Sequence, residues 1–174
     1  MCYKLENYLN HISTILDELY EQESDLFEHD LCERCIMFRF AYRLQKLYEW
    51  TYFVDCEYNK AFKPDENGNY NESSLKWITQ PDWTVSNKYI DIIVRDKRVP
   101  SNSYTDIICF ELKKEWNSEW RDKDKINLEQ LTSNKEGFWY GYQYWFALTF
   151  WKKRDSCVCD IYKWWEILKN FTFN

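Results

Sequence analysis

Three residues in the middle of the chain are of the types that hydrolyse phosphate esters. Asp91 lies in the apolar segment YIDIIV, and Glu111 and Lys113 lie in the segment TDIICFELK. Hard cations such as Mg²⁺ bind carboxylate oxygens, and one or two carboxylates beside a phosphate are enough. A lysine two residues after the second acid can reach the attacking water or the phosphate oxygens. Spacing alone supports equally well a strand-end aspartate and a partly exposed Glu111–Lys113 ion pair, since ion pairs on strands are common.

Two predicted β-strands position these three side chains. The segments 88–95 and 105–113 are rich in isoleucine, with a charged turn between them. Side chains alternate between the two faces of a strand, so Glu111 and Lys113 point the same way. A carboxylate among apolar neighbours, as at Asp91, costs free energy unless it is paired, hydrogen-bonded or bound to a metal. The pattern therefore predicts two acids and a lysine projecting from adjacent strands.

The N-terminal third of the chain predicts two helices and a strand. Apolar residues recur with helical spacing over residues 5–20, which indicates a first amphipathic helix. A second helix is predicted from Ser24 or Asp25, both good N-caps, to about Tyr48. The β-favouring residues of WTYFVDCEY, at 50–58, predict the first strand.

The remaining elements are less regular. Residues 59–87 hold two of the three prolines and many Asn and Ser residues, which predicts a long connection or insertion. The C-terminal half predicts a helix at 119–134, a central strand at 140–151, and an edge strand or a strand leading into a final helix at 157–165.

Size and element order together predict one domain of the α/β class. A chain of 174 residues with 45% hydrophobic residues can build one substantial core. Three neighbouring strands, a crossover helix and a further strand imply a central mixed sheet flanked by helices.

The sequence resembles the PD-(D/E)xK nuclease superfamily. The resemblance is carried by YIDIIV and FELKK, with nineteen residues between Asp91 and Glu111, and by ERCIMFRFAYRLQKLY, VDCEYNK and KDKINLEQLT. These last three are similar to the first helix, the first strand and the helix after the lysine in small bacterial or phage-type members. The resemblance implies a restriction-endonuclease-like αβββαβ core over about 24–150, with an extra N-terminal helix and a C-terminal element.

Carried over residue by residue, the resemblance implies that Asp91 and Glu111 bind the metal and that Lys113 orients or activates the water. It implies further acidic or polar site residues at Glu33, Glu57 and Gln130, which equally fit solvated helix or strand positions. The superfamily pattern has proline before the first acid, where this chain has Ile90. A literal Pro81-Asp82 occurs, but no apolar strand follows it.

The resemblance implies a metal-dependent nuclease with Mg²⁺ as cofactor and Mn²⁺ as its substitute. DNA is the expected substrate and RNA the second, and a homodimer would suit cutting of both strands. The net charge of −6 favours a rival function, a catalytically silent nuclease-fold protein that binds a protein partner through an acidic, aromatic surface. Trp116 and Trp120, just after the motif, fit base stacking as well as core packing.

The cysteines and the hydropathy indicate a cytoplasmic protein. Seven scattered cysteines predict reduced, mostly buried thiols, and the alternative is a zinc site built from Cys32, Cys35, Cys157 and Cys159. No apolar run is long enough to span a bilayer, and no signal-peptide core is present, so no membrane association is expected.

Overall fold

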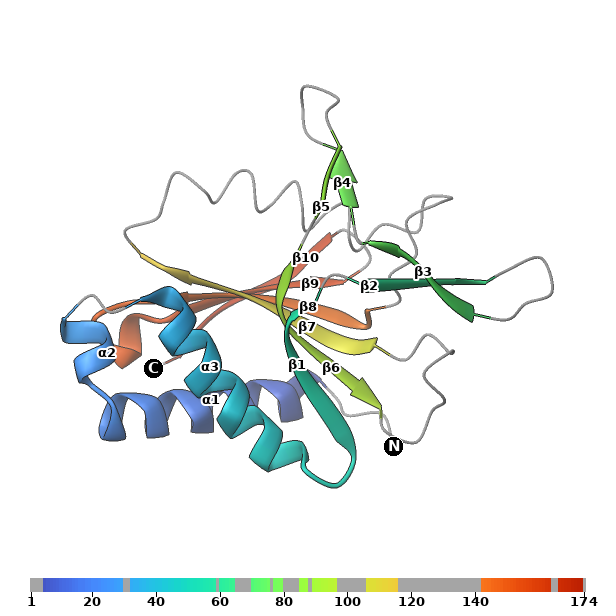
Figure 1. The fold of residues 1–174 in the computed structure, drawn as a ribbon. Helices are drawn as coiled ribbons and strands as arrows, with labels where there is room; N and C mark the ends of the chain where they lie inside the picture. Colours follow the sequence, from blue (N-terminus) through green and yellow to red (C-terminus); the bar gives the residue numbers. More distant parts are fainter. Residues whose placement is uncertain are drawn as a thin grey trace.

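The computed structural model describes residues 5–29, 32–58, 60–64, 70–75, 77–79, 85–87, 89–96, 106–115, 142–163 and 166–173. In this part of the chain, three helices pack on one face of a six-stranded mixed sheet (Figure 1). The helices are α1 (Leu5–Gln22), α2 (Asp25–Glu28) and α3 (Glu33–Tyr48). The α/β class and the mixed sheet predicted from the sequence are confirmed. The crossover helix expected at 119–134 lies outside the described residues.

The main sheet is a mostly antiparallel ladder with one parallel pair. Its strand order is β1-β6-β7-β8-β9-β10, and β7 and β8 run parallel while the other neighbours are antiparallel. A parallel pair needs a crossover connection of a dozen residues or more, which fits the distance in sequence between β7 and β8. The strands are β1 (Tyr52–Tyr58), β6 (Ile90–Asp96), β7 (Asp106–Lys114), β8 (Tyr144–Phe150), β9 (Val158–Lys163) and β10 (Glu166–Thr172).

The core lies between the sheet and the helices. Ile92, Phe110, Phe146 and Ile161 are successive cross-strand partners, all fully buried on the helix-facing side. Phe40 of α3 packs on them, with its ring centroid 5.4 Å from that of Phe110. A second row, made of Ile93, Cys109, Trp145 and Tyr162, is buried on the opposite face of the sheet. Both faces of the central strands are therefore covered.

The first helix is as predicted, whereas the second is not one continuous helix. The apolar stripe of α1 is buried through Ile12, Ile15 and Leu16. The short helix α2 ends at Glu28, and α3 begins at Glu33 after Cys32, whose backbone is extended. Phe27 of α2 stacks on Tyr20 of α1 with ring centroids 3.8 Å apart, which holds α2 on α1. No helix in the described ranges is long and apolar enough to cross a membrane.

The segment 59–87 lies between β1 and β6, as expected, but it contains strands. Two pairs form small two-stranded sheets that project beyond the main sheet (Figure 1). The sequence predicted a connection or insertion here without these strands, because Asn, Ser and Pro residues lie within them and give the segment the composition of a loop. The strands are β2 (Lys60–Pro64), β3 (Tyr70–Leu75), β4 (Trp77–Thr79) and β5 (Val85–Asn87).

The C-terminal elements also differ from the prediction. The central strand β8 is confirmed, since it has β7 and β9 as neighbours. After the short 3₁₀ helix η2 (Arg154–Ser156), β9 is internal rather than an edge strand, and the last element is the edge strand β10 rather than a helix. η2 is tied to α1: the Arg154 guanidinium lies 2.6 Å from the Asp17 carboxylate and donates a hydrogen bond to Ser13 Oγ at 2.7 Å.

Candidate functional site

Asp91 lies where β6 and β7 stop pairing through their backbones. Ile92 faces Phe110 at the end of the regular ladder, so one further residue along each strand puts Asp91 opposite Glu111. There the Leu112 backbone N–H donates to Asp91 Oδ2 at 2.8 Å. The carboxylate takes the place that a backbone carbonyl would have in a continued ladder. This hydrogen bond fixes the first candidate acid against the strand that carries the second.

Glu111 is buried in the middle of β7. Its side chain is 2% exposed, on the same face as Cys109, while Phe110 and Leu112 face the helices. The alternation predicted from the sequence is therefore confirmed. A carboxylate at this depth carries a desolvation cost that hydrogen bonds, an ion pair or a cation must offset. Buried ionisable groups of this kind are candidates for functional sites.

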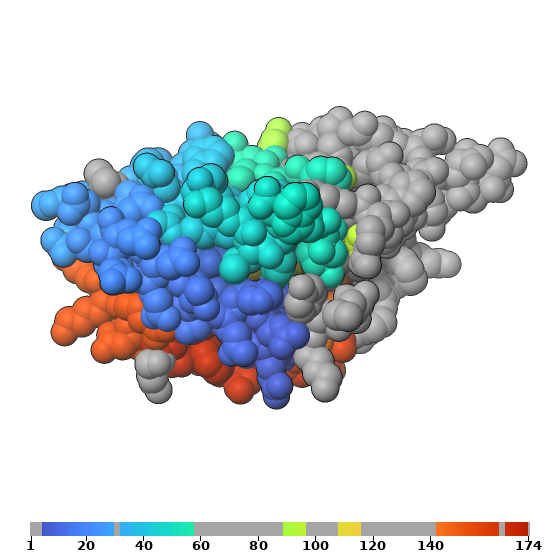
Figure 2. All heavy atoms as spheres, turned by 90° about the horizontal axis from the view of Figure 1, so that it is seen from below, coloured from blue at the N-terminus to red at the C-terminus, as the bar shows by residue number. Residues whose placement is uncertain are grey.

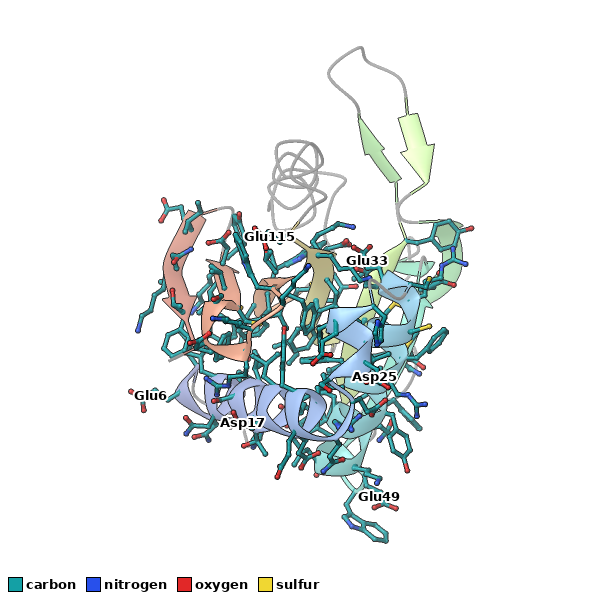
Figure 3. All side chains as sticks on the ribbon, turned by 90° about the vertical axis from the view of Figure 1, so that its left-hand side faces the viewer. Glu6, Asp17, Asp25, Glu33, Glu49 and Glu115 are labelled. Atoms are coloured by element: carbon teal, nitrogen blue, oxygen red, sulfur yellow. The ribbon has the colours of Figure 1, made fainter. Side chains whose placement is uncertain are left out.

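The N-terminus of α3 reaches the end of β7. Lys113 Nζ lies 3.6 Å from Glu33 Oε1, and the Lys114 backbone N–H donates to Glu33 Oε2 at 3.2 Å. Glu33 and Glu115 accordingly lie at the same end of the molecule in Figure 3. The break in the predicted helix makes this contact, because it lets α3 begin at Glu33. Glu33 is thus placed beside the lysine of the motif.

Glu57, near the end of β1, has an unusual backbone. Its φ of 49° is the one positive value among the described non-glycine residues, and such a conformation costs about 1–3 kcal/mol. The Glu57 carboxylate lies 3.2 Å from the Arg34 guanidinium, next to Glu33. Backbone strain of this kind is common at functional sites. Arg34 was not expected in the site; its position beside Glu33 was the only sequence feature pointing to it.

A neighbouring thiol reports the negative charge of this region. Cys56 of β1 faces Ile92 of β6, and burial, followed by the charges of Asp55, Asp91 and Glu57, raises its pKa to about 11. The charges of Asp91 on β6 and Glu57 on β1 therefore both reach the Cys56 thiol. Negative potential of this kind disfavours a further anion and favours a bound cation.

In the described part of the chain, no group of three or more His, Cys, Asp or Glu side chains is arranged to hold a metal ion. The six described cysteines are free, with Cys157 and Cys159 buried and Cys32 and Cys35 exposed. Gln130, Trp116, Trp120 and Pro81-Asp82 lie outside the described residues.

Known proteins add no assignment. Neither the family models, nor the curated proteins, nor the solved structures contain a match to this chain. The chemistry of the site is therefore argued from its own residues. These are two carboxylates on adjacent strands, a lysine two residues after the second acid, and a glutamate that contacts this lysine from α3.

Proposed function

We propose that this chain is a metal-dependent nuclease of the PD-(D/E)xK type that hydrolyses phosphodiester bonds of DNA, with RNA as the second candidate substrate. One observation carries the proposal: Asp91 is fixed by a hydrogen bond to β7 beside the buried Glu111, and Lys113 follows two residues later. Two carboxylates and an ammonium group then belong to the stretch where the regular pairing of β6 and β7 ends. Mg²⁺ or Mn²⁺ suits this donor set.

The residues present fit a hard divalent cation. Asp91 and Glu111 would hold it, since Mg²⁺ is commonly bound through one or two carboxylates plus substrate phosphate, with waters completing the shell. Such a site needs no cage of three protein ligands. When bound, the cation polarises a phosphate oxygen and lowers the pKa of a water molecule. Its charge also offsets the cost of the Glu111 carboxylate at 2% exposure.

Lys113 would act on the phosphate and the water. Hydrolysis forms a bond from a water oxygen to phosphorus, breaks the bond to the leaving oxygen, and returns a proton to that oxygen. The Lys113 ammonium can orient the water and offset charge that develops on the phosphoryl oxygens. Glu33, 3.6 Å from Lys113 Nζ, would hold the ammonium in place, so Glu33 is a positioning residue.

The strand arrangement supports the same proposal. A restriction-endonuclease-like αβββαβ core has a helix, three strands, a crossover and a fourth strand. Here α3 is followed by β1, β6 and β7 as antiparallel neighbours and then by β8 parallel to β7. The segment 59–87 is in this view an insertion between the first two core strands, α1 the extra N-terminal helix, and β9 with β10 the C-terminal element.

The rival function, a catalytically silent protein of this fold that binds a protein partner, has the net charge of −6 in its favour. A cleavage assay with Mg²⁺ or Mn²⁺ on single-stranded DNA, duplex DNA and RNA separates the two. The nuclease proposal predicts metal-dependent cutting that chelation stops. Absence of cutting on all three substrates would leave the rival.

Matched variants assign any activity to this site. Asp91→Asn and Glu111→Gln should abolish cutting, and Lys113→Ala should lower its rate by about 10²–10³-fold, the cost of losing one such donor. Glu166→Gln and Lys152→Ala are the controls, because both side chains are exposed and belong to other strands and turns. A Lys113→Ala protein that cuts at the wild-type rate would point to a contaminating nuclease and refute the proposal.

A further inference from the structure

The outer side of α3 carries a row of cations and aromatic rings. Residues four apart are neighbours on a helix surface, and Arg34, Phe38, Tyr42, Lys46 and Trp50 follow one another at that spacing. We call this row the α3 ridge. Its rings are strongly exposed, with Phe38 at 55%, Tyr42 at 56% and Trp50 at 89%. The Arg34 side chain is 72% exposed, and Lys46 is exposed as well.

The row is continuous in space. Lys46 Nζ lies 4.5 Å from the centroid of the Tyr42 ring, and Trp50 lies in the turn that follows α3. Each step of four residues advances about 40° around an α-helix, so the row winds around the outer side of α3 as it goes. At 1.5 Å per residue the ridge is about 24 Å long. Figure 2 shows α3 at the surface beside α1, and Figure 3 labels Glu33 and Glu49 at the two ends of the helix.

Exposed rings in this number indicate a binding surface. Five of the eight large hydrophobic side chains that are exposed in the described part of the chain lie between residues 38 and 53. Large apolar side chains that gather on one patch mark interaction sites, whereas scattered ones carry no such meaning. The other three, Tyr89, Ile167 and Leu168, lie on or beside other strands.

We infer that the α3 ridge binds single-stranded nucleic acid, with bases stacked on its rings and phosphates beside its cations. The inference rests on the proposed function, because it takes the occupant to be the substrate of the same site. Basic residues interleaved with aromatic rings, on a protein of net charge −6, complement a polyanion with flat bases. A duplex buries its base faces in its own stack and offers the rings no partner.

The ridge begins where the candidate site ends. Arg34 follows Glu33, which contacts Lys113, so a strand leaving the site can continue along α3. Arg34 is paired with Glu57, but an exposed ion pair is worth only about 0–1 kcal/mol and a phosphate can compete with it. Arg39, beside the ridge, is paired with Glu23 at 2.9 Å and is not counted among the binding groups.

The test measures binding in EDTA, so that cleavage plays no part. A labelled single-stranded oligonucleotide about twice the length of the ridge is titrated with protein and followed by fluorescence anisotropy, beside the same sequence as a duplex. Stacking contributes about 1–3 kcal/mol per base, so Phe38→Ala/Tyr42→Ala should weaken single-strand binding by about 30-fold or more. Lys46→Gln should lower the slope of log K against log salt by about 0.7, the value for one phosphate contact.

The control is Ile167→Ser/Leu168→Ser, which changes two side chains of β10 that are each 51% exposed. It should bind the single strand as the wild type does. Equal affinity of the Phe38→Ala/Tyr42→Ala protein and the wild type would overturn the inference, as would tighter binding of the duplex. If sedimentation shows that the wild type is a dimer and the Phe38→Ala/Tyr42→Ala protein a monomer, the ridge is a protein interface instead. If the ridge variant binds the single strand in EDTA as the wild type does, while the wild type still cuts with metal, only this inference is refuted and the proposed function stands.

Discussion

Metal binding should raise the thermal stability of the protein, with or without any cutting. A ligand that binds only the folded state adds RT ln(1 + [L]/Kd), about 2.7 kcal/mol at a hundred times Kd. Unfolding entropy is about 2.1 cal/mol/K per residue, hence about 0.37 kcal/mol/K for 174 residues. The midpoint should therefore rise by about 7 °C at that concentration. Beyond Kd, each further tenfold of metal adds about 1.4 kcal/mol, or about 4 °C, whatever the value of Kd.

The assay is a thermal melt with increasing Mg²⁺ or Mn²⁺, at ionic strength held constant with NaCl. Asp91→Asn and Glu111→Gln each remove a proposed metal ligand, so their midpoints should barely depend on metal. Lys113→Ala should keep the shift, because its ammonium is assigned to the water and the phosphate. Glu166→Gln, exposed on β10, should keep it too. A shift of equal size in wild type, Asp91→Asn and Glu111→Gln would place the cation elsewhere, and no shift in the wild type would refute the metal site.

Three further predictions concern the scaffold. Phe40→Ala removes a fully buried ring between α3 and β7 and should cost about 3–5 kcal/mol in urea unfolding, whereas Phe38→Ala, on the exposed side, should cost about 0.5 kcal/mol or less. Arg43 is 8% exposed and lies 2.6 Å from the Glu23 carboxylate. Arg43→Met should therefore lower the free energy of unfolding by about 2 kcal/mol. Arg39→Met, 60% exposed, should cost less than about 1 kcal/mol. Burial and neighbouring acids raise the Cys56 pKa from 9.0 to about 11, so between pH 9 and pH 11 the unfolded chain loses this proton first. The free energy of unfolding should fall over that range, and Cys56→Ala should flatten the fall; an unchanged pH profile in this variant would contradict the assignment.

Regular spacing made the central part of the fold predictable. Period-two alternation predicted the two faces of β7, with Phe110 and Leu112 on one and Cys109 on the other, and β6 pairs with β7 as expected. Helical spacing gave α1 and the buried stripe of α3. The separation of α2 from α3 was missed because the sequence between Glu28 and Glu33 contains neither proline nor glycine. β10 was missed because the first five of its seven residues are all exposed, which leaves little alternation to detect.

The candidate site was predictable only as far as it is local. Asp91, Glu111 and Lys113 lie on adjacent strands, so strand patterns were enough to bring them together. The approach of Glu33 depends on where α3 starts, and the Arg34–Glu57 pair depends on a backbone angle at Glu57 that no residue type requires. Contacts that depend on where a helix starts or on a strained backbone angle are determined by the whole fold. Glu33 and Glu57 were therefore candidates only because of the resemblance to the superfamily.

The link between α1 and the turn after β8 constrains how the protein assembles during synthesis. Arg154 holds Asp17 and Ser13, and Tyr20 Oη lies 3.1 Å from Cys157 Sγ. These partners are more than 130 residues apart in sequence. α1 can pack on α3 early, through the contact of His11 with Tyr48, but its partners Arg154 and Cys157 are translated much later, so part of its surface stays exposed to water or bound by a chaperone until then. Contacts of such long range slow folding and prolong the exposure of aggregation-prone surface. The packing of α1 is thus completed only after β8 and the turn that follows it have been made.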